Sequence, residues 1–133
     1  MLDCSVALAW LLPGERTAAL DVLGDSLLET SAVVPAIWPY EVSNALRMAE
    51  RRGRVAETDI ADLVRALAAL PIEVEPVAAE HVLTTVIELA HTLDLTTYDA
   101  AYIELARRRA MPLATLDERL RRACALVRVT VLP

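Results

Sequence analysis

The chain has 133 residues, of which 56% are hydrophobic, and its formal net charge is −6 at pH 7. This length predicts one domain, residues 1–133, and no apolar run reaches the ~18 residues that a membrane span needs. The acidic charge argues against a general nucleic-acid coat protein, whose binding face is strongly basic. It leaves a metal-dependent nuclease open, because bound dications would place positive charge where a phosphate must sit.

Two residue types are scarce enough to exclude whole classes of enzyme. All 13 basic residues are arginine, so a P-loop and a receiver-type phosphoacceptor site, which both use a lysine, are excluded. The chain has only three glycines, and no G-x-G-x-x-G dinucleotide turn is present. The first residues contain no basic segment followed by an apolar run, so we expect no secretory signal and a cytoplasmic location.

Strands and helices are predicted to alternate along the chain. A strand over Met1–Cys4 leads into a helix that Ser5 caps and Pro13-Gly14 ends. The later elements are predicted in the order helix 15–28, strand 31–35, helix 37–52, helix 58–70, strand 72–75, helix 78–93, helix 97–109, strand 112–115, helix 117–126 and strand 128–132. This order predicts an α/β fold, a three-layer α/β/α sandwich with a mainly parallel central sheet of four to five strands.

Four carboxylates, Asp3, Glu41, Asp99 and Asp117, are each predicted where a strand turns into a helix. A parallel fold collects ligands at the carboxyl ends of its strands, so these residues would meet in one acidic pocket. Hard oxygen ligands suit Mg²⁺ or Mn²⁺. Each acid also has an ordinary interpretation, as a strand end, a helix cap or a charge in a first helical turn. Their joint placement favours one metal-binding site.

The histidines and cysteines have simpler interpretations. His81 and His91 lie ten positions apart on one predicted helix, outside the acidic segments, and are interpreted as surface or packing residues. Cys4 and Cys124 lack C-x-x-C spacing, so we interpret them as buried free thiols that pack like small hydrophobes.

The segments around the acids resemble a known family, the PIN domain, and within it the ribonuclease toxins of the VapC type. The matching segments are Leu2–Val6, Tyr40–Leu46, Leu95–Tyr102 and Leu113–Leu120. The likeness covers essentially the whole chain in family order.

The resemblance implies a Mg²⁺- or Mn²⁺-dependent endoribonuclease with catalytic Asp3, Glu41, Asp99 and Asp117. Of these acids, Asp3, Asp99 and Asp117 would bind the metal. Ser5, Asn44 and Thr115 match the polar positions that support the acids. The resemblance also implies a homodimer that a cognate antitoxin protein inhibits.

An acidic protein that cleaves RNA needs basic side chains along the path of the RNA backbone. The candidates are Arg51, Arg52, Arg54, Arg119, Arg121 and Arg122, for which a solvated charged face is the competing interpretation. Two other functions remain open from the sequence: a non-catalytic PIN-fold module for protein interaction, and a metal-dependent phosphatase for small molecules.

Overall fold

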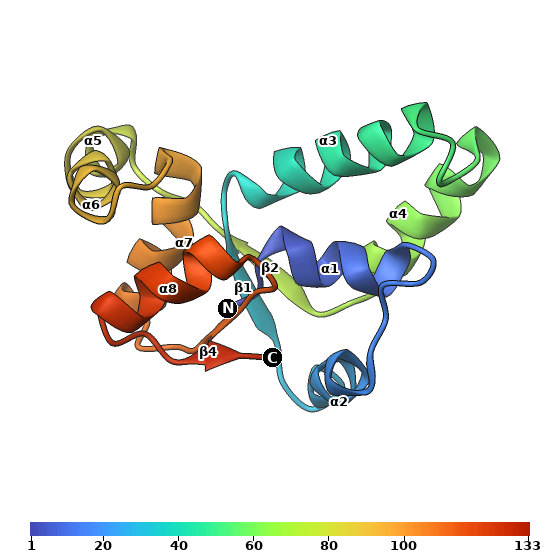
Figure 1. Ribbon diagram of the computed structural model, residues 1–133, viewed down its shortest axis with the longest axis horizontal. Helices are drawn as coiled ribbons and strands as arrows, with labels where there is room; N and C mark the ends of the chain where they lie inside the picture. The colour runs from blue at the N-terminus through green and yellow to red at the C-terminus, as the bar shows by residue number, and fades with distance from the viewer.

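The computed structural model describes residues 1–133, with helices on both sides of a set of short strands (Figure 1). The elements follow in the order α1 (Cys4–Leu11), α2 (Ala18–Ser26), β1 (Ala32–Pro35), α3 (Trp38–Arg51), η1 (Glu57–Asp59), α4 (Ile60–Ala68), β2 (Ile72–Glu75), α5 (Ala79–His81), η2 (Val82–Val86), α6 (Ile87–Leu93), α7 (Thr97–Arg108), β3 (Leu113–Ala114), α8 (Glu118–Leu126) and β4 (Val131–Leu132). None of these helices combines the length and the apolar composition needed to cross a bilayer.

The strands form two parallel pairs, and the first residues of the chain join them. Strand β1 pairs with β2, and β3 pairs with β4. Between the pairs, the amide of Leu2 donates to the carbonyl of Val33 at 3.2 Å. On the other side, the amide of Asp3 donates to the carbonyl of Ala114 at 2.9 Å, and Leu2 and Ala114 form a parallel bridge. The order across the molecule is therefore β2, β1, Met1–Asp3, β3, β4.

This order puts a topological switch point at the first residues of the chain. From Met1–Asp3 the chain moves outward to β1 and β2, and then crosses to β3 and β4 on the other side. In open parallel sheets, ligands bind outside the carboxyl ends of the strands at such a reversal. The fold therefore predicts a ligand site at Asp3 and at the segments that follow β1 and β3.

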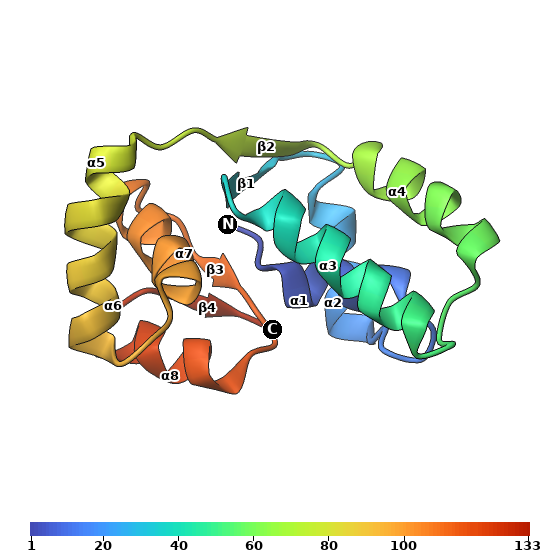
Figure 2. The same ribbon diagram turned by 90° about the horizontal axis from the view of Figure 1, so that it is seen from above.

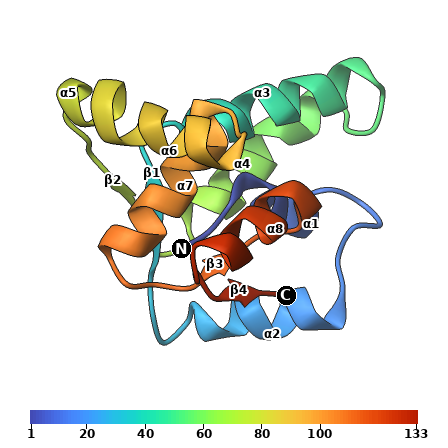
Figure 3. The same cartoon turned by 60° about the vertical axis from the view of Figure 1, so that its left-hand side comes forward.

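The helices divide between two halves of the molecule. Helices α1 to α4 lie in one half and α5 to α8 in the other (Figures 1 and 2). Strands β3 and β4 lie between α7 and α2 (Figure 3). All four residues of β1 are buried, as expected of a strand covered on both faces, whereas β2 lies at the edge and its two middle residues are exposed.

The predicted α/β fold with parallel strands is confirmed, and the differences lie at element boundaries. The first strand, predicted over Met1–Cys4, is reduced to a single bridge at Leu2, and α1 begins at Cys4. The predicted helix 78–93 contains a π-helical turn, η2. The predicted strand 128–132 keeps only β4, because Arg128 has φ 58° and the chain turns there.

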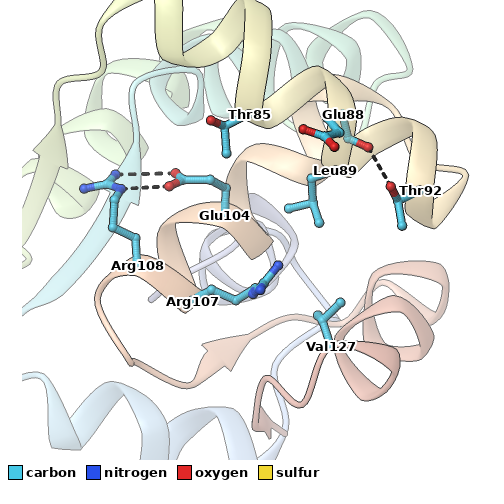
Figure 4. Close-up of a pocket in the computed structure, with 8 residues that line it drawn as sticks. All are labelled: Thr85, Glu88, Leu89, Thr92, Glu104, Arg107, Arg108 and Val127. Atoms are coloured by element: carbon cyan, nitrogen blue, oxygen red, sulfur yellow. Dashed lines mark hydrogen bonds and ion pairs between the residues drawn. The ribbon is translucent and has the colours of Figure 1, made fainter.

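A buried carboxylate ties the edge strand to the helices of one half. Glu104 on α7 is 8% exposed, and its Oε1 lies 2.8 Å from Arg108 Nε and 2.9 Å from His81 Nε2. Arg108 and Arg109 also pair with Glu75 on β2 and hold the pKa of Glu75 below its ordinary value. Glu104 and Arg108 line one side of a cavity of about 530 Å³ between α6 and α7 (Figure 4).

Replacing Glu104 with Ala is expected to lower the free energy of unfolding by about 1–3 kcal/mol, because Arg108 loses the buried carboxylate that accepts its hydrogen bonds and His81 loses the negative charge beside it. Urea denaturation would measure the loss. Glu80→Ala, at an exposed position nearby, serves as the control and is expected to change stability by no more than about 0.5 kcal/mol. Equal stability of the two variants would contradict a stabilising role for the Glu104 contacts.

Candidate functional site

Asp3 lies at the carboxyl end of the central segment and is held in one orientation. It is 5% exposed, and its Oδ2 accepts hydrogen bonds from Ser5 Oγ at 2.5 Å and from Thr115 Oγ1 at 2.7 Å. Ser5 Oγ in turn accepts a bond from the amide of Leu116 at 2.9 Å. The start of α1 and the loop between β3 and α8 therefore fix the Asp3 carboxylate together.

Glu41 lies in the first turn of α3, shortly after β1, and contacts α7. The hydroxyl of Tyr102, which is 1% exposed, donates to Glu41 Oε2. Burial raises the pKa of Glu41 above its ordinary value, and the hydrogen bond from Tyr102 opposes that rise. The negative charges of Asp3 and Asp99 raise the pKa of Glu41 further.

Asp99 lies in the first turn of α7 and takes part in a cap. Thr96 Oγ1 accepts from the amide of Asp99 at 3.1 Å and donates to Asp99 Oδ2 at 2.8 Å. The prediction that Asp99 follows a strand was wrong, because the preceding element is α6. A left-handed residue, Asp94 with φ 52°, ends α6 and turns the chain into α7.

Asp117 follows β3 and caps α8. Its Oδ1 accepts from the amides of Arg119 at 2.7 Å and Leu120 at 3.0 Å. Its own amide donates to Thr115 Oγ1 at 3.1 Å, the same hydroxyl that binds Asp3. Asp117 is exposed, so it lies at the rim while Thr115 links its backbone to the buried acid.

Three of the four acids share one electrostatic environment. Burial raises the pKa of the Cys4 thiol, and the charges of Asp3, Glu41 and Asp99 raise it further. The same Asp3 and Asp99 act on Glu41, whereas Asp117 acts on neither group. The structure therefore brings Asp3, Glu41 and Asp99 together and leaves Asp117 at the edge of the cluster.

Each acid uses one carboxylate oxygen for hydrogen bonds and leaves the other without a protein donor. The oxygens without a donor are Asp3 Oδ1, Glu41 Oε1, Asp99 Oδ1 and Asp117 Oδ2. The oxygens of Asp3, Glu41 and Asp99 are not among the buried polar atoms that lack a partner, and Asp117 is itself exposed, so solvent reaches all four. These oxygens are therefore open to water and free of protein donors.

The donor set fits a divalent cation that keeps most of its water. No three His, Cys, Asp or Glu side chains lie close enough to enclose an ion directly. Mg²⁺ dehydrates reluctantly and is usually bound through one or two carboxylates and several waters. Open oxygens in a negative pocket suit that mode of binding better than a dry cage.

The other predicted polar residues divide between contacts with the acids and a neighbouring groove. Ser5 and Thr115 both bind Asp3, whereas Asn44 is exposed and donates to none of the acids. Asn44 and Ser5 instead line a groove of about 470 Å³ between α1 and α3, together with Arg52 and Arg54.

The remaining candidate arginines lie outside this groove. Arg121 donates to the carbonyls of Thr115 at 2.8 Å and Leu132 at 3.2 Å, so it holds β4 against the loop after β3. Arg119 donates to the carbonyl of Asp94 and supports the turn before α7. Arg51 and Arg122 are exposed and have no ion-pair partner, in agreement with a solvated charged face.

Sequence reasoning assigned no role to Tyr102, which contacts Glu41. The spacing of the two residues pointed to a place near the site, because Asp99 and Tyr102 are three residues apart on one helix and residues at that spacing share a face. The sequence did not predict how α7 packs against α3, and this packing places Tyr102 beside Glu41.

Replacing Glu41 with Gln is expected to raise Tm by about 2–5 °C at pH 7, because the variant removes a charge that burial and two acids destabilise. The pKa of Glu41 is raised in the folded state, so its charge costs stability as pH rises through its ordinary value. The gain should therefore shrink towards zero at about pH 4.

Calorimetry of Glu41→Gln at both pH values, with the exposed Glu29→Gln as the control, measures this difference. A variant no more stable than the original chain at pH 7 would show that the cluster carries no electrostatic cost.

Comparisons with known proteins identify the family and agree with the fold. The family description "PIN domain" matches residues 1–126. The crystal structure of PAE2754 from Pyrobaculum aerophilum is similar with a TM-score of 0.70 and 25% sequence identity, covering 92% of this chain and 83% of that chain. No curated protein sequence matches. From its sequence match and its fold, the chain belongs to the PIN-domain family.

Proposed function

We propose that the chain is a Mg²⁺- or Mn²⁺-dependent endoribonuclease and the toxin of a toxin–antitoxin pair. Membership of the PIN-domain family indicates nuclease activity. The observation that carries the proposal is the cluster of Asp3, Glu41 and Asp99, with Asp117 at its rim, in which each carboxylate keeps one oxygen open to solvent. The segments that resemble VapC toxins contain the same acids.

Asp3, Asp99 and Asp117 are the residues that would hold the metal, and they would do so largely through its bound waters, because no three acids lie close enough to enclose an ion directly. A bound divalent ion would lower the pKa of water and stabilise negative charge on the phosphodiester. Ser5 and Thr115 both occupy Oδ2 of Asp3, which leaves Oδ1 for the ion. Thr96 occupies Oδ2 of Asp99, and backbone amides of α8 occupy Oδ1 of Asp117. Asp99 Oδ1 and Asp117 Oδ2 are left for the ion.

Glu41 would orient the attacking water and take its proton at Oε1, the oxygen without a protein donor. A general base works best when its pKa is near the working pH, and the pocket moves the pKa of Glu41 in that direction. Tyr102 binds Oε2 and keeps the side chain directed from α3 towards the other acids. By family analogy the products carry a 5′ phosphate and a 3′ hydroxyl.

The proposed partners are the RNA substrate, a cognate antitoxin and a second copy of the chain. An apolar hollow of about 240 Å³ between α3, α4 and β2 supports a protein partner. It is lined by Trp38, Val42 and Leu46, and by Val64 and Val74, which are 49% and 43% exposed. Light scattering tests the homodimer, and a strictly monomeric chain would contradict it.

Replacing Asp99 with Asn is expected to reduce RNA cleavage by at least about 100-fold, because the variant loses a charge that binds the metal. The Asn side chain still accepts from Thr96, so Tm should stay within a few degrees. Cleavage of a structured RNA with Mn²⁺ and with EDTA measures the effect, and the exposed Asp25→Asn is the matched control.

The same assay separates the competing functions. Full activity in Asp99→Asn would reject the metal assignment. Turnover of a generic phosphate ester without RNA cleavage would indicate a small-molecule phosphatase. Absence of both activities in the original chain would indicate a non-catalytic interaction module.

Replacing Tyr102 with Phe is expected to move the acidic limb of the pH–rate profile to higher pH. The hydrogen bond from Tyr102 opposes the rise in the pKa of Glu41, so its removal raises that pKa further and less Glu41 is ionised at a given acidic pH. Cleavage should fall more at about pH 6 than at about pH 8. Tyr98→Phe, at a position 57% exposed on the same helix, should leave the profile unchanged.

A further inference from the structure

A groove leads away from the acid cluster towards the end of α3. It has a volume of about 470 Å³ and is lined by residues of α1, of the second half of α3 and by Leu116 after β3. One end contains Ser5, which binds Asp3 directly, and the amide of Leu116 binds the same hydroxyl. The other end contains Arg52 and Arg54. The groove therefore runs from Ser5, the hydrogen-bond partner of the buried Asp3, to two guanidinium groups.

The turn after α3 determines where these two arginines lie. Gly53, with φ 67°, follows the helix in the left-handed conformation, and the amide of Arg54 returns to the carbonyl of Ala49 at 2.9 Å. Gly53 therefore reverses the chain so that both flanking arginines line the groove. Arg52 is exposed and has no ion-pair partner, while Arg54 pairs with Glu15 across the groove.

We propose that this groove binds a single-stranded segment of the RNA beside the cleaved phosphodiester, with Arg52 and Arg54 contacting backbone phosphates. The inference rests on the proposed function and adds the direction in which the bound RNA extends away from the acids. Residues 41 and 51 are 10 positions apart on α3, about 15 Å at the rise of an α-helix, and Arg52 follows directly, which gives room for a short stretch of RNA.

The lining of the groove favours RNA as the occupant. Leu8 and Met48 supply apolar surface for bases or riboses, Asn44 supplies an amide for hydrogen bonds, and the two arginines supply positive charge. Proteins that bind single-stranded nucleic acid combine these features: a basic track for the backbone and apolar or aromatic surface for the bases.

Glu15 reduces the positive charge at the arginine end of the groove. Its carboxylate pairs with Arg54, so a phosphate must compete with it for the guanidinium. Both side chains are partly exposed, and an exposed ion pair contributes at most about 1 kcal/mol. Removing the charge with Glu15→Gln should therefore tighten RNA binding by up to about fivefold.

Fluorescence anisotropy with a labelled single-stranded oligoribonucleotide in EDTA tests the groove without cleavage. The double variant R52A/R54A is expected to weaken binding by at least about tenfold and to lower the salt dependence of binding. The matched control is R47A/R65A, which removes the same charge from exposed positions outside the groove. Equal losses in the two double variants would overturn the proposal, because nonspecific charge would then explain both.

Cleavage kinetics in Mn²⁺ separate this proposal from the proposed function. If the original chain cleaves RNA, R52A/R54A should raise KM with little change in kcat, and an unchanged KM would reject the groove alone. If the original chain cleaves no RNA, the proposed function fails, and the binding comparison still decides whether the groove binds RNA. A Glu15→Gln variant that binds RNA more weakly would contradict the competition between Glu15 and phosphate.

Discussion

The structure depends on how Asp3 is seated between the two pairs of strands. The backbone hydrogen bonds of Met1, Leu2 and Asp3 to β1 and β3 join the pairs into one arrangement. The same residue carries a buried carboxylate that accepts hydrogen bonds from Ser5 and Thr115. Sheet continuity and site geometry therefore rest on the same few atoms, and a change that moved this segment would disturb both.

The charge of Glu41 opposes folding, and its neighbours limit the cost. Asp3, Glu41 and Asp99 lie near enough to raise the pKa of Cys4, and the pKa of Glu41 is itself raised. Hydroxyl donors stabilise one oxygen of each of these acids: Ser5 and Thr115 for Asp3, Tyr102 for Glu41 and Thr96 for Asp99. These donors fix the carboxylates without neutralising them. The remaining negative charge is what a divalent ion would stabilise.

The sequence predicted the elements and the acids because both leave local signals. Strand β2 was predicted over the residues it occupies, and the caps by Thr96 and Asp117 follow from side chains next to a helix start. The first strand was predicted too long, because apolar character cannot tell how many residues find partners. The contact between Tyr102 and Glu41, and the groove shared by Asn44 and Arg52, depend on how helices pack. No local pattern encodes that packing.

The distribution of charge, more than its sum, decides whether an acidic protein can bind RNA. The net charge of −6 would repel a phosphate chain at long range, but screening limits that repulsion to about 8–10 Å at physiological salt. Close to the surface, the groove presents Arg52 and Arg54 at one end and Ser5, which binds the buried Asp3, at the other. A backbone phosphate held by the arginines would bring its neighbours along the groove towards Asp3, where bound metal would offset the local negative charge. Most arginines outside the groove are also paired with acids or hydrogen-bonded to backbone carbonyls, which reduces the positive charge that those surfaces would offer a phosphate, whereas Arg52 in the groove has no such partner.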